Sequence, residues 1–357
     1  MNYDIKEISS HFSVEKIIGG YGNGHINDTF LCDNSPRYIL QRINSTVFKN
    51  PEEVMENIEN VTKHLKKKIK AAGGDPERET LTVVPTVEGE NCYKDKNNNY
   101  FRMYRFIENS ITYEIAEDPI QLYYAGKAFG RFQNMLDDFP ADKLHETITD
   151  FHNTPERVNQ LKAAMKADKS GRLDKIKAEV DFALEYSKYA AYITEAMKEG
   201  TVPLRVTHNE TKLNNILFDN KSGEGVCVID LDTVMPGSML YDFGDAMRFG
   251  AASGAEDEKD LEKIWFDTEK FEQFTKGFVG EMRETITEKE IELLPLSVLI
   301  MTYECGIRFL ADHLNGDVYF KIHRENHNLD RAHTQFKLVY DIESKLDELS
   351  AIVKKYV

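Results

Sequence analysis

The hydrophobic pattern of the first third of the chain predicts several short strands and one long helix. Short apolar runs bounded by glycine and polar residues are typical of β-strands. These runs cover residues 14–18, 26–32, 37–43, 81–84 and 100–107. Between the third and fourth runs, apolar residues recur at steps of three and four and form one stripe on a helix. The stripe consists of Val54, Ile58, Val61, Leu65 and Ile69.

The ends of this long helix are marked by capping residues. Asn50 is the expected N-cap, Pro51 takes the first helical position, and Glu53 stands three residues after the cap. This arrangement is a capping box with the proline that helix starts favour. Gly73 is expected to end the helix.

The rest of the chain shows mainly helical periodicity. A helix is expected to start at Asp118-Pro119, where Gly126 and Gly130 would permit close packing. Further helical patterns cover about 155–198, 256–282, 288–314 and 327–355. The order of three strands, a helix and two strands, followed by helices, is that of a kinase-like protein. We therefore expect an α+β, protein-kinase-like two-lobed fold. A small antiparallel β lobe would span 1–107, and a large helical lobe would span 108–357.

Composition and charge narrow the classes of function. The 45 Lys and Arg residues against 61 Asp and Glu give a net charge of −16. This balance disfavours nucleic-acid binding, which needs clustered cations. The cysteines, Cys32, Cys92, Cys227 and Cys305, are scattered and indicate neither zinc nor disulfides. With no export signal or long apolar run, we expect a cytoplasmic monomer without membrane contact.

One polar cluster predicts phosphoryl-transfer chemistry. Glu210 stands two residues after His208, Asn215 follows five residues later, and Asp230 comes after the next predicted strand. In kinases the first acid accepts the proton of the substrate hydroxyl, and the amide and the second acid hold Mg²⁺. Oxygen ligands of this kind suit a hard cation. We interpret His208 as a buried residue that braces the loop.

The segment between Asn215 and Asp230 supports this geometry. Residues 216–218 and 226–229 read as two strands around a turn at 219–223. Such a hairpin would return Asp230 to the neighbourhood of Asn215. Asp242-Phe243-Gly244 matches a metal-binding tripeptide of protein kinases, but it comes too late, beyond a predicted turn at 235–238. We expect Asp242 to begin a helix and to brace the catalytic loop.

Two segments of the N-terminal third are expected to contact a nucleotide. The glycine-rich segment 19–24 would let backbone amides approach phosphate closely, although glycines between strands more often mark ordinary turns. Its expected contacts are Gly22, Asn23 and Gly24. The connector between the lobes, with Phe106, Ile107 and Glu108, would bind adenine through its backbone.

The catalytic segments carry a resemblance to a known family. The chain resembles the choline kinase and aminoglycoside phosphotransferase superfamily and, within it, bacterial N-acetylhexosamine 1-kinases over nearly its whole length. The similar segments are 22–27, 38–41, 206–209, 211–217, 229–233, 235–239, 304–312 and 316–320. The blocks around Asn215 and Asp230 are common to the superfamily, whereas the last two favour the sugar kinases.

The resemblance implies an activity and a set of site residues. The γ-phosphate of ATP would pass, with Mg²⁺, to the anomeric hydroxyl of N-acetylglucosamine or N-acetylgalactosamine, giving a sugar 1-phosphate. Glu210 would occupy the base position, and Asp232 would add a metal or outer contact beside the two Mg²⁺ residues. The residues placed beside the sugar are His25, Arg308 and Tyr319. Arg308 and Tyr319 could equally be a helix-packing pair.

The chain departs from the kinase pattern at two positions. The usual base is Asp, whereas Glu210 is one methylene longer and shifts the carboxylate unless the loop compensates. Gln41 stands where protein kinases have a phosphate-binding lysine, which leaves Glu59 on the following helix without its usual partner. We still expect Gln41 and Glu59 at the nucleotide, with a hydrogen bond between them as one option and a surface position for Glu59 as the other.

Two alternative functions follow from the same residues. The chain could phosphorylate another small alcohol, such as choline, ethanolamine or an aminoglycoside, although cationic acceptors call for acidic or aromatic pockets. It could also be a nucleotide-binding pseudoenzyme, as Glu210 and Gln41 suggest, but the retained Asn215 and Asp230 argue against this. A protein kinase is disfavoured, because the Ala-Pro-Glu that closes an activation loop is absent.

Overall fold

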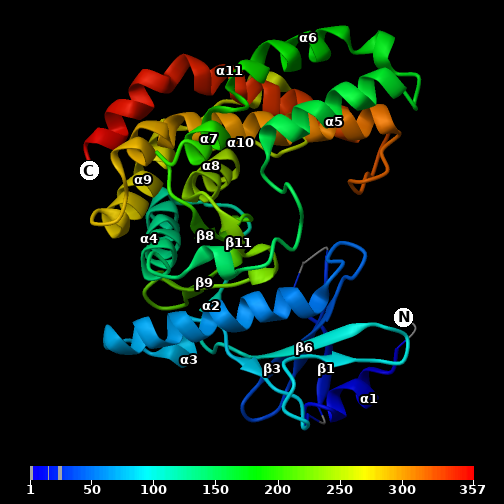
Figure 1. Ribbon diagram of the computed structural model, residues 1–357, viewed down its shortest axis with the longest axis vertical. Coiled ribbons are helices and arrows are strands. Elements are labelled where there is room, and N and C mark those ends of the chain that lie inside the picture. The colour runs from blue at the N-terminus through cyan, green and yellow to red at the C-terminus, as the bar shows by residue number, and fades with distance from the viewer. Residues whose placement is uncertain (1–2, 15, 23–25) are drawn as a thin grey trace.

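The protein has two lobes of unequal size. A computed structural model describes residues 3–14, 16–22 and 26–357. The N-terminal lobe, drawn in blue and cyan in Figure 1, holds the main sheet, and the larger lobe is mostly helical. Helices account for 51% of the chain and strands for 12%. The predicted kinase-like fold, with a small antiparallel lobe and a large helical lobe, is confirmed.

The N-terminal lobe is built on a six-stranded antiparallel sheet in the described residues, with the order β1-β2-β3-β6-β4 and β5 paired with β6. Its strands are β1 Ile17–Gly20, β2 Asp28–Cys32, β3 Tyr38–Ile43, β4 Val83–Val84, β5 Tyr93–Lys94 and β6 Tyr100–Arg105. Its helices are α1 Ile5–Ser10, α2 Pro51–Ala71 and α3 Pro76–Glu79. The predicted strand and helix order is confirmed, whereas β5, α1 and α3 are additions.

The two faces of this sheet are covered differently. One face closes over a small apolar cluster with α1. This cluster consists of Ile8, Phe12, Val14, Phe30, Cys32, Leu40, Phe101 and Met103. The long helix α2 buries its predicted stripe in the main core, which continues into the second lobe. Buried Asn57 on α2 bonds the backbone of His145 and Val234, so α2 is tied to the larger lobe as well.

The C-terminal lobe is a set of helices around two small sheets. Its helices are α4 Pro119–Met135, α5 Thr154–Ala167, α6 Lys177–Tyr186, α7 Tyr192–Lys198, α8 Met239–Gly250, α9 Thr268–Met282, α10 Glu288–Asn315 and α11 His327–Lys354. Its strands are β7 Ser110–Ile111, β8 Arg205–Thr207, β9 Ile216–Asp219, β10 Gly225–Val228 and β11 Met235–Gly237. Short 3₁₀ helices cover Ala141–Lys143, Leu173–Lys175, Ser187–Tyr189, Leu213–Asn215, Leu231–Thr233 and Leu261–Lys263.

Helices α4 and α9 approach closely through glycines. A Cβ on Gly126 would lie 2.2 Å from the carbonyl oxygen of Phe274, and one on Gly130 would lie 2.6 Å from that of Phe278. Real side chains do not tolerate such distances, so only glycine permits this backbone contact. The predicted close packing at both glycines is confirmed.

Three sequence expectations differ from the observed elements. The helical pattern at 155–198 is broken into α5, α6 and α7, because Asp168 ends α5 in the left-handed region. The pattern at 256–282 yields a regular helix only from Thr268. The predicted turn at 235–238 is strand β11, paired with β8, and Pro236 is tolerated because a two-stranded ladder leaves backbone positions unpaired.

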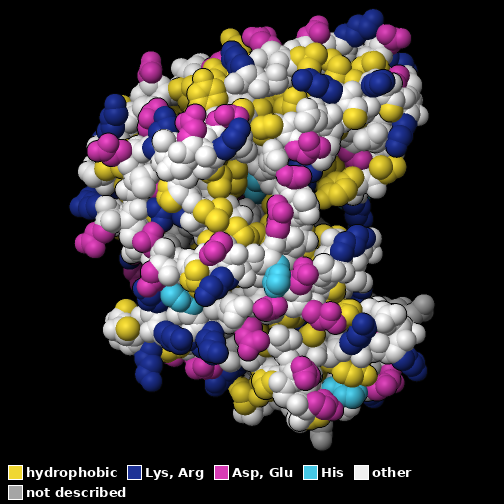
Figure 2. Space-filling view, viewed as in Figure 1, with side chains coloured by type: hydrophobic (Ala, Val, Ile, Leu, Met, Phe, Trp, Pro, Cys, Tyr) yellow, Lys and Arg dark blue, Asp and Glu magenta, His cyan; other side chains and the backbone are white. Residues whose placement is uncertain are grey.

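Helix α10 passes through the centre of the larger lobe. By length and composition it could cross a membrane, and it is the one such helix among the described residues. Its most apolar window is 83% buried inside the protein, as in the core helix of a globular fold. On the face drawn in Figure 2, acidic and basic side chains are interspersed, and the surface is indented between the lobes.

Candidate active site

The hairpin β9–β10 brings the two predicted metal residues together. Asn215 directly precedes β9, and Asp230 comes two residues after the end of β10. The two strands pair, with Val228 opposite Ile216, and the Ile229 N–H donates to the Asn215 carbonyl at 2.9 Å. The prediction that this hairpin returns Asp230 to Asn215 is therefore confirmed.

His208 is a buried brace of the catalytic loop. Its ring is fully buried, and Nε2 lies 2.8 Å from the Ile229 carbonyl while Nδ1 faces the Glu210 N–H at 3.3 Å. These partners assign a neutral ring protonated on Nε2. The ring thus joins the start of the catalytic loop to the strand that leads to Asp230, as its predicted bracing role requires.

Helix α8 supports the loop through Asp242. The Asp242 carboxylate accepts the N–H groups of His208 at 2.9 Å and Asn209 at 2.7 Å, together with the Gln133 amide at 2.6 Å. Burial raises the pKa of this carboxyl, and the bonds from the loop oppose that effect. The prediction that Asp242 braces the loop is confirmed, whereas the helix begins three residues before Asp242, at Met239, with Ser238 as its N-cap.

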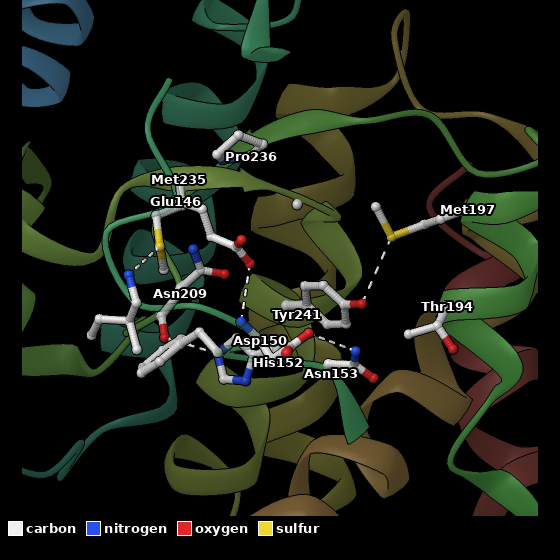
Figure 3. A pocket seen from close by; sticks show the side chains of 13 residues that line it. Glu146, Asp150, His152, Asn153, Thr194, Met197, Asn209, Met235, Pro236 and Tyr241 are labelled. Carbon is white, nitrogen blue, oxygen red and sulfur yellow. Dashed lines mark hydrogen bonds between the residues drawn. The ribbon is translucent and has the colours of Figure 1, made fainter. Parts of the chain in front are cut away.

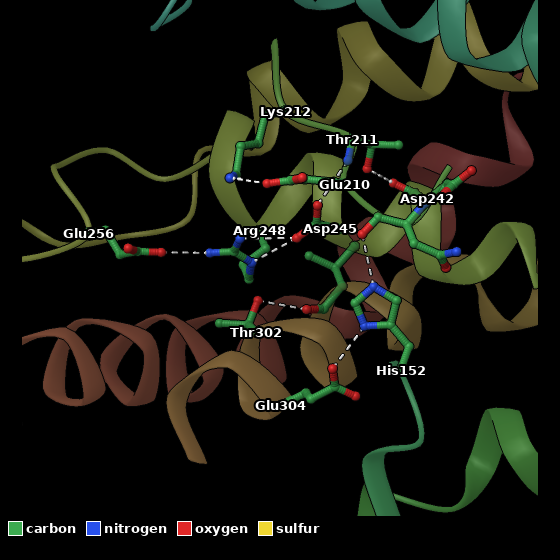
Figure 4. A network of polar contacts seen from close by, with 12 residues as sticks. His152, Glu210, Thr211, Lys212, Asp242, Asp245, Arg248, Glu256, Thr302 and Glu304 are labelled. Atoms are coloured by element: carbon green, nitrogen blue, oxygen red, sulfur yellow. Dashed lines mark hydrogen bonds and ion pairs between the residues drawn. The ribbon is translucent and has the colours of Figure 1, made fainter. Parts of the chain in front are cut away.

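A second acid of α8 holds the other half of the loop. Asp245 accepts the Thr211 N–H at 3.0 Å and forms an ion pair with Arg248. Figure 4 shows Asp242 and Asp245 pointing toward the loop from the helix beneath it. Backbone groups that are buried and hydrogen-bonded in this way leave the loop little freedom to shift.

Glu210 points away from these buried braces. Its carboxylate Oε1 binds the Lys212 ammonium at 2.5 Å, while the Glu210 carbonyl accepts the Asn215 amide at 2.8 Å. Burial lowers the pKa of Lys212, but the Glu210 carboxylate outweighs it and raises the pKa above its ordinary value. The longer glutamate side chain therefore has a defined cationic partner two residues along the same loop.

The Asp230 carboxylate is placed to act as an oxygen ligand for a cation. Among the described residues it accepts no hydrogen bond and forms no ion pair, and its backbone is in the left-handed region at φ 60°. Burial, followed by the charges of Asp232 and Glu210, raises the pKa of this carboxyl. The Asn215 side-chain NH₂ is used on Glu210, which leaves its oxygen for a metal. This donor set fits Mg²⁺.

Asp232 is turned toward the N-terminal lobe. It is 3% exposed, and its carboxylate pairs with Arg102 at 2.5 Å and accepts the Asn27 amide at 2.7 Å. The expected metal residue is thus engaged by two side chains of the other lobe, and Arg102 is its counter-ion.

The residues predicted to contact the nucleotide differ in where the structure places them. Asn23 and Gly24 lie outside the described residues, whereas Gly22 forms an exposed bend with φ +77°. Gln41 bonds Thr29 and Arg102 instead of Glu59. The considered bond between Gln41 and Glu59 is therefore absent: Glu59 is exposed and accepts the Asn91 amide at 3.2 Å.

The connector between the lobes is held by arginines. The Arg37 guanidinium lies over the Phe106 ring at 4.0 Å and pairs with Glu108. The carbonyl groups of Ile107 and Glu108 accept bonds from Ser110 and Arg78, respectively. These contacts fix the path of the backbone that was predicted to meet adenine.

The predicted acceptor residues lie on α10 and the loop that follows it. His25 is outside the described residues. The Arg308 guanidinium lies between the rings of Phe151 at 5.8 Å and Phe320 at 5.6 Å. Tyr319 is 69% exposed, so the two residues are not a helix-packing pair.

A buried bridge links the acceptor side to the catalytic loop. His152 lies 3.1 Å from the carbonyl oxygen of Asn209 through Nε2, and 2.8 Å from a carboxylate oxygen of Glu304 through Nδ1. Glu304 precedes Arg308 by one helical turn on α10, so the two share a face. The bridge between Glu304 and His152, visible in Figure 4, therefore connects the helix that carries Arg308 to the catalytic loop.

A cavity of about 280 Å³ opens beside this bridge. Figure 3 shows its lining from the loop at 146–153, helix α7 and strand β11, with Tyr241 at its centre. Two carboxylates, Glu146 and Asp150, belong to this lining. The Glu146 carboxylate accepts the Asp150 N–H at 3.0 Å, which ties the loop to itself.

Several residues of the site were not singled out from the sequence. Arg102 and His152 are far from the catalytic segment in sequence and carry no motif, and Glu304 begins the similar segment 304–312 but was given no role. Lys212 and Asp245 had weak signals: Lys212 is inside the catalytic segment, and Asp245 follows Asp242 by one helical turn.

Known structures of the same fold include several small-molecule kinases. A microcompartment-associated aminopropanol kinase is 15% identical, with a TM-score of 0.65 and 97% of both chains covered. An aminoglycoside phosphotransferase from Alicyclobacillus acidocaldarius is 11% identical, with a TM-score of 0.64 and coverage of 99% of this chain and 98% of that one. A spectinomycin phosphotransferase, solved with ADP and spectinomycin, is 14% identical, with a TM-score of 0.57 and coverage of 98% and 100%. At these identities the likeness establishes the fold.

A family assignment comes from the sequence match. The model of the phosphotransferase enzyme family matches residues 18–274, which include the sheet of the first lobe, the catalytic loop and α8. This match covers well over half of the chain. The chain belongs to the phosphotransferase enzyme family.

Proposed function

We propose that the protein is an ATP-dependent kinase that phosphorylates the anomeric hydroxyl of N-acetylhexosamines. The observation that carries the transfer chemistry is the meeting of Glu210, Asn215 and Asp230 on one braced loop and hairpin. The residues at the predicted acceptor positions, Arg308 and Tyr319, support the sugar assignment, as does the resemblance of the last two sequence blocks.

In this mechanism Glu210 is the base. As the acceptor oxygen attacks the γ-phosphorus, its proton passes to the Glu210 carboxylate, the bond to the bridging oxygen of ADP breaks, and ADP leaves. The bond from Lys212 holds one carboxylate oxygen and leaves the other for the proton. Asn215 and Asp230 would hold Mg²⁺, which when bound neutralises charge on the phosphates. Bracing by Asp242 keeps these groups in line, and such positioning accounts for much of the rate of phosphoryl transfer.

The charge of the acceptor side favours a neutral acceptor. Arg157 lies near Arg308, and burial followed by the Arg308 charge lowers the pKa of Arg157, although Glu304, Tyr319 and Asp150 act in the opposite direction. Two neighbouring guanidinium groups repel a cationic amino alcohol but can donate hydrogen bonds to hydroxyl and acetamido oxygens.

One observation favours a second candidate, an amino alcohol or aminoglycoside kinase. Glu146 and Asp150 line the cavity beside the catalytic loop, and their carboxylates could receive an ammonium group. The aminopropanol and aminoglycoside enzymes of the same fold support this candidate. It differs from the sugar kinase in the acceptor alone.

A panel assay tests the proposal. ADP release with Mg²⁺ and ATP would be measured with N-acetylglucosamine, N-acetylgalactosamine, glucose, galactose, choline, ethanolamine, aminopropanol and an aminoglycoside. We expect turnover with the two N-acetylhexosamines and none with their 1-O-methyl glycosides, in which the anomeric hydroxyl is blocked. Response to cationic acceptors alone would replace the sugar assignment with the second candidate. ATP binding without transfer to any acceptor would indicate a pseudoenzyme.

A further inference from the structure

Strand β3 carries an amide where kinases have their phosphate-binding lysine, and that amide holds an arginine of the next strand. Gln41 and Arg102 are directly opposite each other in the β3–β6 pair. The side-chain oxygen of Gln41, Oε1, accepts hydrogen bonds from Arg102 Nε at 3.1 Å and from Nη2 at 2.9 Å. A second bond from the Gln41 amide to Thr29 at 3.0 Å fixes which way the amide points. Gln41 therefore fixes the position of the Arg102 guanidinium.

Three buried polar atoms meet at this place. They are Arg102 Nη1, Asp232 Oδ1 and Tyr104 Oη. Arg102 Nη1 and Asp232 Oδ1 lie 2.5 Å apart and satisfy each other as an ion pair, which leaves Tyr104 Oη without a partner among the described residues. The Arg102 guanidinium also lies 5.1 Å from the Tyr104 ring centre. Native proteins leave few buried polar groups unsatisfied, so the Tyr104 hydroxyl beside this ion pair points to a further polar partner at this place.

The position of the cluster indicates what that partner is. Arg102 is 1% exposed and extends from the sheet of the N-terminal lobe to Asp232, two residues after the candidate metal residue Asp230. A guanidinium binds phosphate oxygens with charge-assisted hydrogen bonds, and kinases need one fixed cation at the nucleotide phosphates. Tyr104 adds a hydroxyl donor on the same strand. This chemistry fits a nucleoside polyphosphate.

We propose that Arg102 is the phosphate-binding cation of the nucleotide site and that Asp232 occupies it when no nucleotide is bound. A phosphate oxygen then replaces the Asp232 carboxylate as partner of Nη1, and the released carboxylate becomes available beside Asp230. Gln41 keeps the guanidinium in place through the exchange. The inference rests on the proposed function only in that the substrate is ATP; it is independent of the acceptor.

The exchange predicts opposite effects for the two partners of one ion pair. ATP and adenosine binding would be measured by calorimetry in EDTA, without metal or acceptor. We expect Arg102→Gln to weaken ATP relative to adenosine by about tenfold or more, the loss of a charge-assisted hydrogen bond. Asp232→Asn removes the competing anion and should strengthen ATP by about fivefold with adenosine unchanged. A purely structural pair would instead lower the melting temperature in both variants and leave the ratio of the two affinities as in the wild type.

Two further variants complete the test. Arg105→Gln removes an exposed arginine of the same strand, paired with Glu77, and should leave the ratio unchanged. Gln41→Lys combined with Arg102→Gln returns the cation to strand β3 and should restore most of the ATP preference. If Arg102→Gln does not fold, the double variant Arg102→Gln with Asp232→Asn takes its place, because it leaves no unpaired buried charge. The ratio of the ATP and adenosine affinities is measured in the same way. An unchanged ratio in Arg102→Gln, alone or combined with Asp232→Asn, or a wild type that binds ATP no more tightly than adenosine, would overturn the proposal. Because no acceptor is present, a wrong acceptor assignment leaves these results unaffected.

Discussion

The catalytic loop and the acceptor-side loop, residues 316–320 after α10, are each anchored by a buried aspartate of their own. The two loops differ in how far their side chains are exposed. Asp242 accepts two N–H groups of the catalytic loop, and most of that loop is buried. Asp312 accepts the N–H groups of Val318, Tyr319 and Phe320 at 2.9–3.0 Å. The side chains of Val318 and Tyr319 are nevertheless exposed.

The difference separates two requirements of the proposed reaction. Transfer needs reacting groups placed to within about 1 Å, which buried hydrogen bonds provide. Acceptor choice needs side chains that reach out from a fixed backbone, such as Tyr319 on the loop held by Asp312. We infer that changes in the first loop affect every acceptor equally, whereas changes in the second alter acceptor affinity.

The largest expected effect is that of Glu210→Ala, which removes the base. We expect kcat to fall by about two to four orders of magnitude, the usual range for general acid–base catalysis. Glu210→Asp should retain or raise turnover, because it restores the usual carboxylate length. ADP release and the melting temperature would be measured in parallel. An alanine variant with unchanged turnover would exclude Glu210 as the base.

Asp242→Asn tests the brace of the catalytic loop. The amide cannot accept all three bonds of the carboxylate, so the loop should shift and kcat should fall about a hundredfold for every acceptor. The free energy of unfolding should drop by about 1–3 kcal/mol, measured by urea denaturation. An effect confined to one acceptor would contradict the separation of the two loops.

Asp312→Asn is the matched change in the acceptor-side loop. It weakens three backbone bonds and a bond from Asn328 without touching the catalytic loop. We expect the KM of the acceptor to rise about tenfold, with kcat less affected and the Kd of ATP unchanged. Steady-state kinetics with varied acceptor would decide, and an equal loss of kcat for all acceptors would argue against the proposed role.

Tyr319→Phe should have the smallest effect. The side chain is largely exposed, so its hydroxyl can be lost without a change in stability. If it donates to the sugar, the KM should rise by about fivefold, the value of one net hydrogen bond. Leu204→Ala, at an exposed position with no assigned role, is a control. Identical kinetics in Tyr319→Phe and the control would remove Tyr319 from the acceptor site.

Much of the catalytic centre could be predicted because its residues are close in sequence. Glu210, Asn215 and Asp230 are joined by one loop and one hairpin, so local strand pairing alone brings them together. The brace by Asp242 was predictable because a helix was expected to follow this segment directly. Of the two options for Glu59 the structure has the surface position, because Gln41 turns to Arg102 across the sheet, a choice that no local pattern records.

The amino-acid sequence by itself determined the order of strands and helices, the catalytic residues within one segment and the family. These features depend on periodicity and short-range spacing, which the chain carries directly. Tertiary structure alone decided that Arg102 meets Asp232 between the lobes and that His152 joins the Asn209 carbonyl to Glu304. Such contacts join residues up to 152 positions apart, so they depend on how whole elements pack, and packing is settled only when the complete core forms.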